Sequence, residues 1–428
     1  MLENAAYRHY REKLQSARYF AAPMVKQSDV AFRLLVRRWG AECCYTPMLK
    51  SSRFLKGDHL EMTEFATIQQ STADRPLVAQ ISGRDPVELV AMARLLQELA
   101  PGGFDAIDLN FGCPAICAEE GSYGAFLLEG EENIQVACEC VRALASSSDA
   151  FVPVFCKIRI LEDCEATVRL AKRLVEAGCS LLTVHGRVRS ARSSGPVNLD
   201  TIAAVKAALD IPVVANGGVR SKAEAEDVLQ RTGCDGVMVA VALLVNPMLF
   251  VQPQETPSLT QAVRIAHEYL TLAEKYPPGR PITIQKHFWY FFRNVLLRSH
   301  GRDAKDGDII GSEVSDRFVM VRGEKVLLCL VGSEQHRFYT FMCQPYLRSP
   351  KQFRELLRLM THALGLGPEA AAADTGPELP SSEEQPVLSL AEIRQLGSSL
   401  PPGPLEDEQA EVETQESQAL SYDPWAAD

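Results

Sequence analysis

Short apolar runs rich in β-branched residues alternate with amphipathic helical patterns between Ala17 and Phe250. This alternation predicts parallel strands joined by helices, because each helix returns the chain to begin the next strand at the same end. Predicted strands occupy residues 17–24, 42–48, 76–83, 106–112, 154–160, 181–187, 212–218 and 236–240. Eight repeats in roughly 230 residues predict an α/β fold of the (β/α)8 TIM-barrel type. A doubly wound Rossmann sheet is the alternative, but its usual six strands are exceeded and no GxGxxG follows the first strand.

The pattern changes after the predicted barrel. Residues 256–276, 282–300 and 349–367 predict amphipathic helices, which we expect to form a small helical domain over 256–366. A segment at 301–333 breaks the helical period as an insertion, and its alternating part predicts a hairpin around Arg322 and Gly323. Residues 367–428 are rich in Pro, Ser and Glu and predict a disordered acidic tail. The first predicted region, 1–255, is the barrel.

The acidic tail dominates the charge of the chain. Residues 367–428 contain fourteen acidic residues and one basic residue, Arg394, so the net charge of this tail is −13. The net charge of the whole chain is −11. Residues 1–366 therefore carry +2. A mildly basic body can bind RNA through a local patch, so the acidic total does not exclude a nucleic-acid partner.

Other protein classes are disfavoured by what the sequence lacks. No apolar run reaches the length of a membrane span, and the opening MLENAAYRHYREKLQ has no apolar signal region. Twelve cysteines without repeated CxxC pairs predict reduced thiols, with neither a disulfide framework nor a zinc site. We expect a monomer without metal or membrane, located in the cytoplasm or the nucleus.

Polar residues stand at the carboxyl ends of five predicted strands. The carboxyl ends of barrel strands meet at one rim, where enzymes of this fold build their sites. Each residue alone is compatible with a satisfied polar group at a strand end, but five in corresponding positions indicate a shared site. These residues are Gln80, Asn110, Lys157, His185 and Asn216.

Cys113 lies in DLNFGCPAICAEEGSYGAFLL, residues 108–128, directly after a predicted strand. Glycines on both sides predict a flexible loop at the rim, from which a thiol reaches a substrate. A thiol donates a proton without needing a charged ground state. From this segment alone, a structural role for Cys113 fits as well as a catalytic one.

The segments after the seventh and eighth strands predict an anion site. ANGGV, residues 215–219, and the helix start after residue 239 expose backbone N–H groups where barrels usually bind phosphate. One terminal phosphate there and a planar ring across the mouth fit flavin mononucleotide, FMN. Lys157 lies in an apolar strand, so its ammonium needs an anionic or dipolar partner at the strand end, although a lysine at a barrel mouth also snorkels to water. Arg159 shares the same strand face and is suited to hold a base or a phosphate.

Several of these motifs together carry a family resemblance. APMV, CYTPML, DLNFGCP, CKIRI, TVHGR, VVANGGV and DGVMVAVALLVNP make the chain resemble the tRNA-dihydrouridine synthases over nearly all of residues 17–300. PVNLDTI and the HFWYFF helix look most similar to the eukaryotic branch that modifies positions 20a and 20b of the tRNA D-loop. The branch that modifies positions 16 and 17 is the next most similar.

The resemblance implies an FMN enzyme that takes hydride from NADPH, or NADH, and passes it to C6 of a uracil in tRNA. Cys113 would protonate C5, while Asn110 and Arg159 would orient the flipped base. The helical domain would help to bind the tRNA. The cofactor residues that the resemblance implies are Pro23, Met24 and Val25 beside the flavin, Gln80 at its ring edge, Lys157 and His185 at the ring and ribityl chain, and Asn216, Gly217, Gly218, Ala240 and Val241 at the phosphate.

The chain departs from the family pattern at the phosphate end. Many members have an arginine after the eighth strand that pairs with the FMN phosphate, whereas this chain has Val241 after Ala240. The 16/17 branch also lacks this arginine. Two alternatives follow: a catalytically impaired relative that still binds RNA, favoured by Val241 and the 301–333 insertion, or an FMN barrel oxidoreductase acting on a small molecule, which would not need the helical domain.

Overall fold

The computed structural model describes residues 4–58, 61, 62, 65, 73–147, 152–192, 194–251 and 257–298, with short pieces at 318–321, 324–327, 349–351, 353, 354, 357 and 358. Most of the predicted third helix at 349–367, most of the 301–333 insertion and the whole predicted acidic tail lie outside the described residues. The predicted domain boundaries at 255 and 366 therefore stay predictions.

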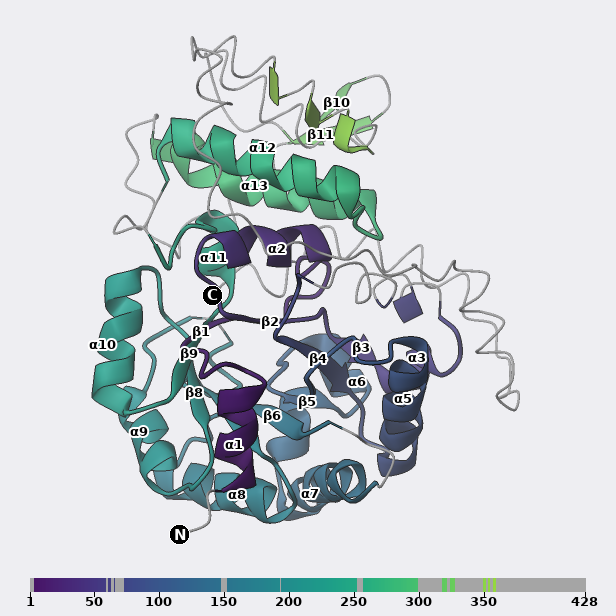
Figure 1. Cartoon of the computed structure of the whole chain (residues 1–428), viewed down its shortest axis with the longest axis vertical. Helices are drawn as coiled ribbons and strands as arrows, with labels where there is room; N and C mark the ends of the chain where they lie inside the picture. The colour runs from purple at the N-terminus through teal and green to yellow at the C-terminus, as the bar shows by residue number, and fades with distance from the viewer. Residues whose placement is uncertain are drawn as a thin grey trace.

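Eight parallel strands close into a barrel (Figure 1). Around the barrel the order is β2-β1-β9-β8-β7-β6-β5-β4, and pairing of β2 with β4 closes the ring. This confirms the predicted TIM barrel, since every predicted strand range contains one observed strand. The barrel strands are β1 (Tyr19–Ala21), β2 (Cys43–Tyr45), β4 (Leu77–Ser82), β5 (Ala106–Phe111), β6 (Val154–Arg159), β7 (Leu181–His185), β8 (Val213–Asn216) and β9 (Gly236–Val239), and β3 (Leu49–Lys50) extends the sheet beside β4.

Helices surround the barrel (Figure 1). Among the described helices of this part, six begin at an Asp, Asn or Ser whose side-chain oxygen accepts a hydrogen bond from a first-turn N–H, the preferred way to satisfy those donors. The helical segments of this part are α1 (Ala5–Glu12), α2 (Val30–Arg38), α3 (Ser51–Phe54), α5 (Pro86–Leu99), α6 (Ile116–Glu120), the 3-10 turn η1 (Gly124–Leu128), α7 (Glu131–Ser146), α8 (Cys164–Glu176), α9 (Leu199–Ala207), α10 (Lys222–Thr232) and α11 (Val241–Val245).

The barrel interior is apolar near the amino ends of the strands. Inward side chains such as Phe20, Phe155 and Met238 form one cluster there with Tyr10 and Leu14, which come from α1 and the turn after it. The Tyr10 hydroxyl donates a 2.6 Å hydrogen bond to the carbonyl of Ala17. Because α1 and its turn close this end, the carboxyl ends of the strands are where a site can be built.

Two long helices, α12 (Leu259–Lys275) and α13 (Pro281–Arg298), lie side by side against α2 and α11 (Figure 1). Trp39 Nε1 donates a 3.0 Å hydrogen bond to Glu268 of α12. His287 of α13 lies 2.8 Å from Asp29, the N-cap of α2, and stacks on Phe32. These contacts are buried, so both helices are anchored on the barrel beside the loop that follows β1.

Two further described strands, β10 (Phe318–Val321) and β11 (Glu324–Leu327), pair antiparallel. They flank residues 322 and 323, as the predicted hairpin requires. None of the described helices combines the length and apolar character needed to cross a membrane.

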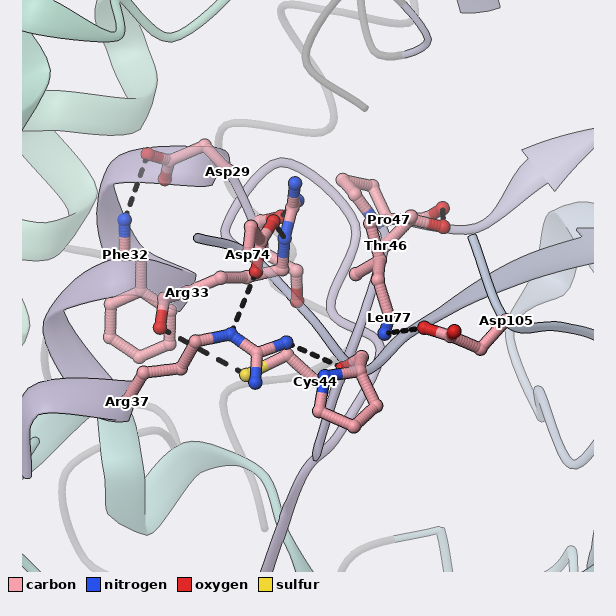
Figure 2. A network of polar contacts seen from close by, with 12 residues as sticks. Asp29, Phe32, Arg33, Arg37, Cys44, Thr46, Pro47, Asp74, Leu77 and Asp105 are labelled. Carbon is pink, nitrogen blue, oxygen red and sulfur yellow. Dashed lines mark hydrogen bonds and ion pairs between the residues drawn. The ribbon is translucent and has the colours of Figure 1, made fainter. Parts of the chain in front are cut away.

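A buried ion-pair network fixes the loop after β1 (Figure 2). Asp74 accepts hydrogen bonds from Arg33 Nε at 2.7 Å and from Arg37 Nε at 2.9 Å. Arg33 also donates to the carbonyl of Ser28. Burial alone would raise the pKa of Asp74, but the two guanidinium groups hold it below its usual value. The network therefore ties α2 and the end of the β1 loop to the segment that enters β4.

Candidate functional site

The predicted rim residues come from neighbouring strands. Strand register places Asn110 opposite Lys157, Arg159 opposite His185, and His185 opposite Asn216. Gln80 of β4 lies opposite Asp108 of β5. The convergence of these residues at the carboxyl end of the barrel, predicted from their positions at strand ends, is thus confirmed, whereas their individual roles stay predictions.

Three polar side chains on β4 and β5 form a hydrogen-bonded chain that ends at the loop carrying Cys113. Gln80 Nε2 donates to Asp108 Oδ2 at 2.9 Å, and Asn110 Nδ2 donates to Gln80 Oε1 at 3.5 Å. Asn110 Oδ1 accepts from the backbone N–H of Gly112 at 2.9 Å and of Cys113 at 3.0 Å. Asn110 therefore shapes the turn after β5, in addition to any contact with a substrate.

Asp108 is a fully buried acid within the barrel. Its Oδ1 has no hydrogen-bond partner among the described residues. Burial raises the pKa of this carboxyl to about 7, although the bond from Gln80 and the charge of Lys157 favour the anion. Burial, followed by the charge of Asp108, raises the pKa of the Tyr45 hydroxyl well above its usual value. A group with a strongly shifted pKa inside the barrel, below the rim, is a candidate functional residue.

Lys157 and Asn216 contact each other across the mouth. Lys157 Nζ donates a 2.8 Å hydrogen bond to Asn216 Oδ1, and Asn216 Nδ2 donates to the carbonyl of Met238 at 2.9 Å. Asn216 is buried and Lys157 is half-buried. The amide is therefore fixed in one orientation and aims the ammonium along the rim, where an anionic or dipolar ligand would meet it.

His185 packs against the glycine pair that follows β8. The N–H of Arg187 points at His185 Nδ1 at 3.3 Å, so in a neutral ring the proton sits on Nε2. Gly217 and Gly218 both have positive φ, at 109° and 76°. A Cβ on Gly217 would lie 3.3 Å from His185 Nε2, and one on Gly218 would lie 2.9 Å from Val197. Only glycine lets the backbone amides turn this way so close to the imidazole.

The other predicted cofactor residues flank the same mouth. Pro23 and Met24 are buried and Val25 is half-buried in the turn after β1, where Met24 N donates to Ser28 Oγ at 2.8 Å. Ala240 follows β9 and is the N-cap of α11, and Val241 is the first residue of that helix. Ala22 N donates to the carbonyl of Val239, so the β1 turn and the start of α11 are held next to each other.

Arg159 binds backbone carbonyls. Its Nε donates a 2.8 Å hydrogen bond to the carbonyl of Gly112, and its Nη1 donates to the carbonyl of Arg192. The guanidinium therefore ties the Cys113 loop to the loop after β7. Its role in orienting a base stays a prediction. In this conformation the guanidinium would have to contact the base while it also donates to these two carbonyls.

Cys113 is covered. It is 2% exposed and belongs to a small apolar cluster with Ala115, Ala118 and Tyr123. Its carbonyl accepts from Ala125 N at 3.0 Å, and a Cβ on Gly124 would lie 2.8 Å from that carbonyl. The expectation of a thiol open at the rim is wrong for this conformation, because the following turn folds back over it. Its catalytic role stays a prediction that requires the thiol to be uncovered.

Sequence reasoning missed Asp108, although this residue begins the DLNFGCP motif. The signal was available, because alternation in a strand puts Asp108 on the same face as Asn110. A carboxyl there must lie inside the barrel below the rim. Ser82, one strand away at the end of β4, is also buried, and its hydroxyl has no partner within the described part of the chain.

Comparison with known proteins matches the whole barrel and the start of α13. The family model for dihydrouridine synthase (Dus) matches residues 20–285. A rat protein named tRNA-dihydrouridine(16/17) synthase NAD(P)(+)-like is 40% identical over 350 residues, covering 79% of this chain and 76% of that protein. A human protein named tRNA-dihydrouridine(20a/20b) synthase NAD(P)+-like is 41% identical over 282 residues, covering 66% and 84%. The tRNA-dihydrouridine(16/17) synthase of Saccharomyces cerevisiae is 32% identical over 305 residues, covering 69% and 70%.

Proposed function

This chain belongs to the dihydrouridine synthase family, and from that premise we propose that it reduces uridine in the D-loop of tRNA to 5,6-dihydrouridine. The observation that carries the proposal is the convergence of Lys157, Asn216 and the Gly217–Gly218 turn at one barrel mouth inside the matched region. The relatives named for 16/17 and for 20a/20b are 40% and 41% identical, so we leave the modified position open between them.

The residues at the mouth fit FMN. Lys157 Nζ and the backbone amides of Gly217 and Gly218 are donors for ring oxygens and for a phosphate, and the glycines leave room that a Cβ would fill. Val241 contributes no charge to the phosphate, unlike the arginine of many family members. Backbone amides would then hold the phosphate, and we propose that Pro23, Met24, Val25, Gln80, His185 and Ala240 line the remainder of the cofactor.

Bound FMN, reduced by NADPH or NADH, would supply the hydride that adds to C6 of uracil. Cys113 Sγ would give its proton to C5, which completes the saturation of the C5–C6 bond. Asn110 would shape the Cys113 turn and also contact the base. Arg159 would contact the base while it bridges two loops. The target uridine must leave its stack to enter the mouth, because the reacting atoms lie inside the barrel rim.

We propose that α12 and α13 form part of the tRNA-binding surface. Both helices are anchored on α2, next to the β1 turn that flanks the mouth. Binding to phosphates releases counterions, and this release is less favourable at higher salt, so the logarithm of tRNA affinity should fall linearly with the logarithm of salt concentration.

The deciding experiment begins with the visible spectrum of the purified full chain before and after incubation with FMN. The reconstituted protein is then incubated with NADPH or NADH and unmodified tRNA, and dihydrouridine is measured by mass spectrometry of nucleosides. A flavin spectrum with dihydrouridine in the D-loop supports the proposal. A protein that binds tRNA but never FMN supports the impaired relative that Val241 favours, and a flavoprotein that oxidises NADPH without acting on tRNA supports a small-molecule oxidoreductase.

A further inference from the structure

The hydrogen-bonded chain from Asp108 to the Cys113 loop has a fixed direction. Asn110 Oδ1 accepts two backbone N–H groups of the loop, so its Nδ2 turns away from the loop, toward Met48 Sδ at 2.7 Å and Gln80 Oε1 at 3.5 Å. Gln80 must then present Oε1 to Asn110 and Nε2 to Asp108, as observed. An amide has donors on one side and an acceptor on the other, so reversing either one would place two donors face to face.

The hydrogen-bonded chain ends on an acceptor oxygen, which this direction requires. Asp108 Oδ2 accepts the Gln80 Nε2 bond at 2.9 Å. Asp108 is fully buried, so water does not replace it as the acceptor. Without an acceptor at this position, Gln80 loses the contact that holds its amide, and a buried donor without a partner drives the amide to rotate.

We propose that Asp108 is a positioning residue that, through Gln80 and Asn110, holds the Cys113 loop closed and sets which atom of the Gln80 amide faces a ring bound at the mouth. The first half of the proposal, which concerns the Cys113 loop, applies to the protein without any cofactor. The second half rests on the proposed function, because Gln80 is assigned there to the edge of the flavin. Asp108 itself touches neither the cofactor nor the base in this proposal.

The principal test compares Asp108→Leu with Asp108→Asn in the flavin-free full chain. Iodoacetamide is added, and alkylation of each cysteine is followed by peptide mass spectrometry. Leucine removes the acceptor, so alkylation of Cys113 should accelerate at least about tenfold, whereas asparagine retains a carbonyl acceptor and should stay within about twofold of wild type. Cys164 is exposed and serves as the internal reference, with an unchanged rate in every variant.

Two further variants separate positioning from general loss of stability. Asp235→Leu removes a carboxylate that accepts from Val213 N and Lys206 Nζ near the start of β8 and β9. It should lower the melting temperature without changing the rate at Cys113. Gln80→Met breaks the hydrogen-bonded chain in the middle while leaving Asp108 in place. It should accelerate alkylation of Cys113 as Asp108→Leu does, so the proposal can still be tested if Asp108→Leu fails to fold.

FMN affinity, measured by quenching of flavin fluorescence, tests the second half. Asp108→Leu should weaken FMN binding at least about tenfold, and Asp108→Asn should bind like wild type near pH 6. Wild-type rates at Cys113 in both Asp108→Leu and Gln80→Met would overturn the proposal, as would equal acceleration in Asp235→Leu. Failure of the wild type to bind FMN would instead contradict the proposed function, since the alkylation experiments contain no flavin.

Discussion

Lys157 Nζ donates a 2.8 Å hydrogen bond to Asn216 Oδ1, joining β6 to β8 across the intervening strand β7. Asn216 is held in turn by the carbonyl of Met238. Because the amide is neutral, this bond orients the ammonium without neutralising its charge. The arrangement therefore places an oriented positive charge beside the Gly217–Gly218 turn, as a site for an anionic or dipolar ligand requires.

Replacing Lys157 by methionine should weaken FMN binding about tenfold to a hundredfold, because one charge-assisted hydrogen bond is lost. The measurement is fluorescence titration of FMN into the flavin-free protein. Lys206→Met is the matched control, since Lys206 also uses its ammonium in half-buried contacts, with Tyr7 and Asp235, but near the opposite end of the barrel. Equal FMN affinity in Lys157→Met and wild type would remove Lys157 from the cofactor site.

Cys113→Ala should bind FMN and oxidise NADPH at wild-type rates but form dihydrouridine at least about a hundredfold more slowly, the typical contribution of a positioned general acid. The comparison requires single-turnover measurements with reduced protein and unmodified tRNA. Cys117→Ala, from the same segment, is the control and should retain activity. Dihydrouridine formation at the wild-type rate by Cys113→Ala would exclude Cys113 as the proton donor.

Most of the barrel was predictable because the signals are local. The alternation of strand and helix patterns located all eight barrel strands, and the local capping residues Asp29, Asp85 and Asp163 are N-caps of helices that join them. The short α1 that closes the amino end was not predicted. Its contacts run to residues about 200 positions away, such as Lys206 with Tyr7, and no local pattern reveals such partners.

The candidate site was predictable in its location but less so in its contacts. Strand ends in corresponding positions identified Lys157 and Asn216, yet nothing in the sequence shows that their side chains bond to each other. Arg159 is similar, because its partners are backbone carbonyls of two distant loops, which have no residue-specific signature. The Cys113 thiol was expected to be exposed at the rim, and its burial depends on how the turn after it folds back at Gly124.

Asp74→Ala should lower the free energy of unfolding by about 3–5 kcal/mol, because Arg33 and Arg37 would stay buried without their shared carboxylate. The side chains of Asp74 and Arg33 are each 1% exposed. Asp163→Ala removes an exposed N-cap of α8 and should cost only about 1 kcal/mol. Chemical denaturation of both variants makes the comparison, and a loss for Asp74→Ala no greater than that for Asp163→Ala would show that the buried network adds little.

Asp108 should make the folded state less stable as pH rises from 5 to 7. Its pKa is raised to about 7 in the folded protein, by burial, against about 4 for an unfolded aspartate. Between these values the folded state keeps a proton that the unfolded state has released, so the unfolding free energy falls by about 1.4 kcal/mol per pH unit. The titratable groups that interact with Asp108 are Lys157 and Cys156 of β6 and Tyr45 of β2.

Asp108→Asn removes this titration while keeping an acceptor for Gln80. Every other titratable group is common to both proteins, so the difference between wild type and variant isolates Asp108. Between pH 5 and pH 7, wild type should lose roughly 2 kcal/mol of unfolding free energy relative to Asp108→Asn, measured by denaturation at several pH values. Parallel curves would mean that Asp108 is already ionised at pH 5, and that Lys157 and Gln80 together outweigh the cost of burying its charge.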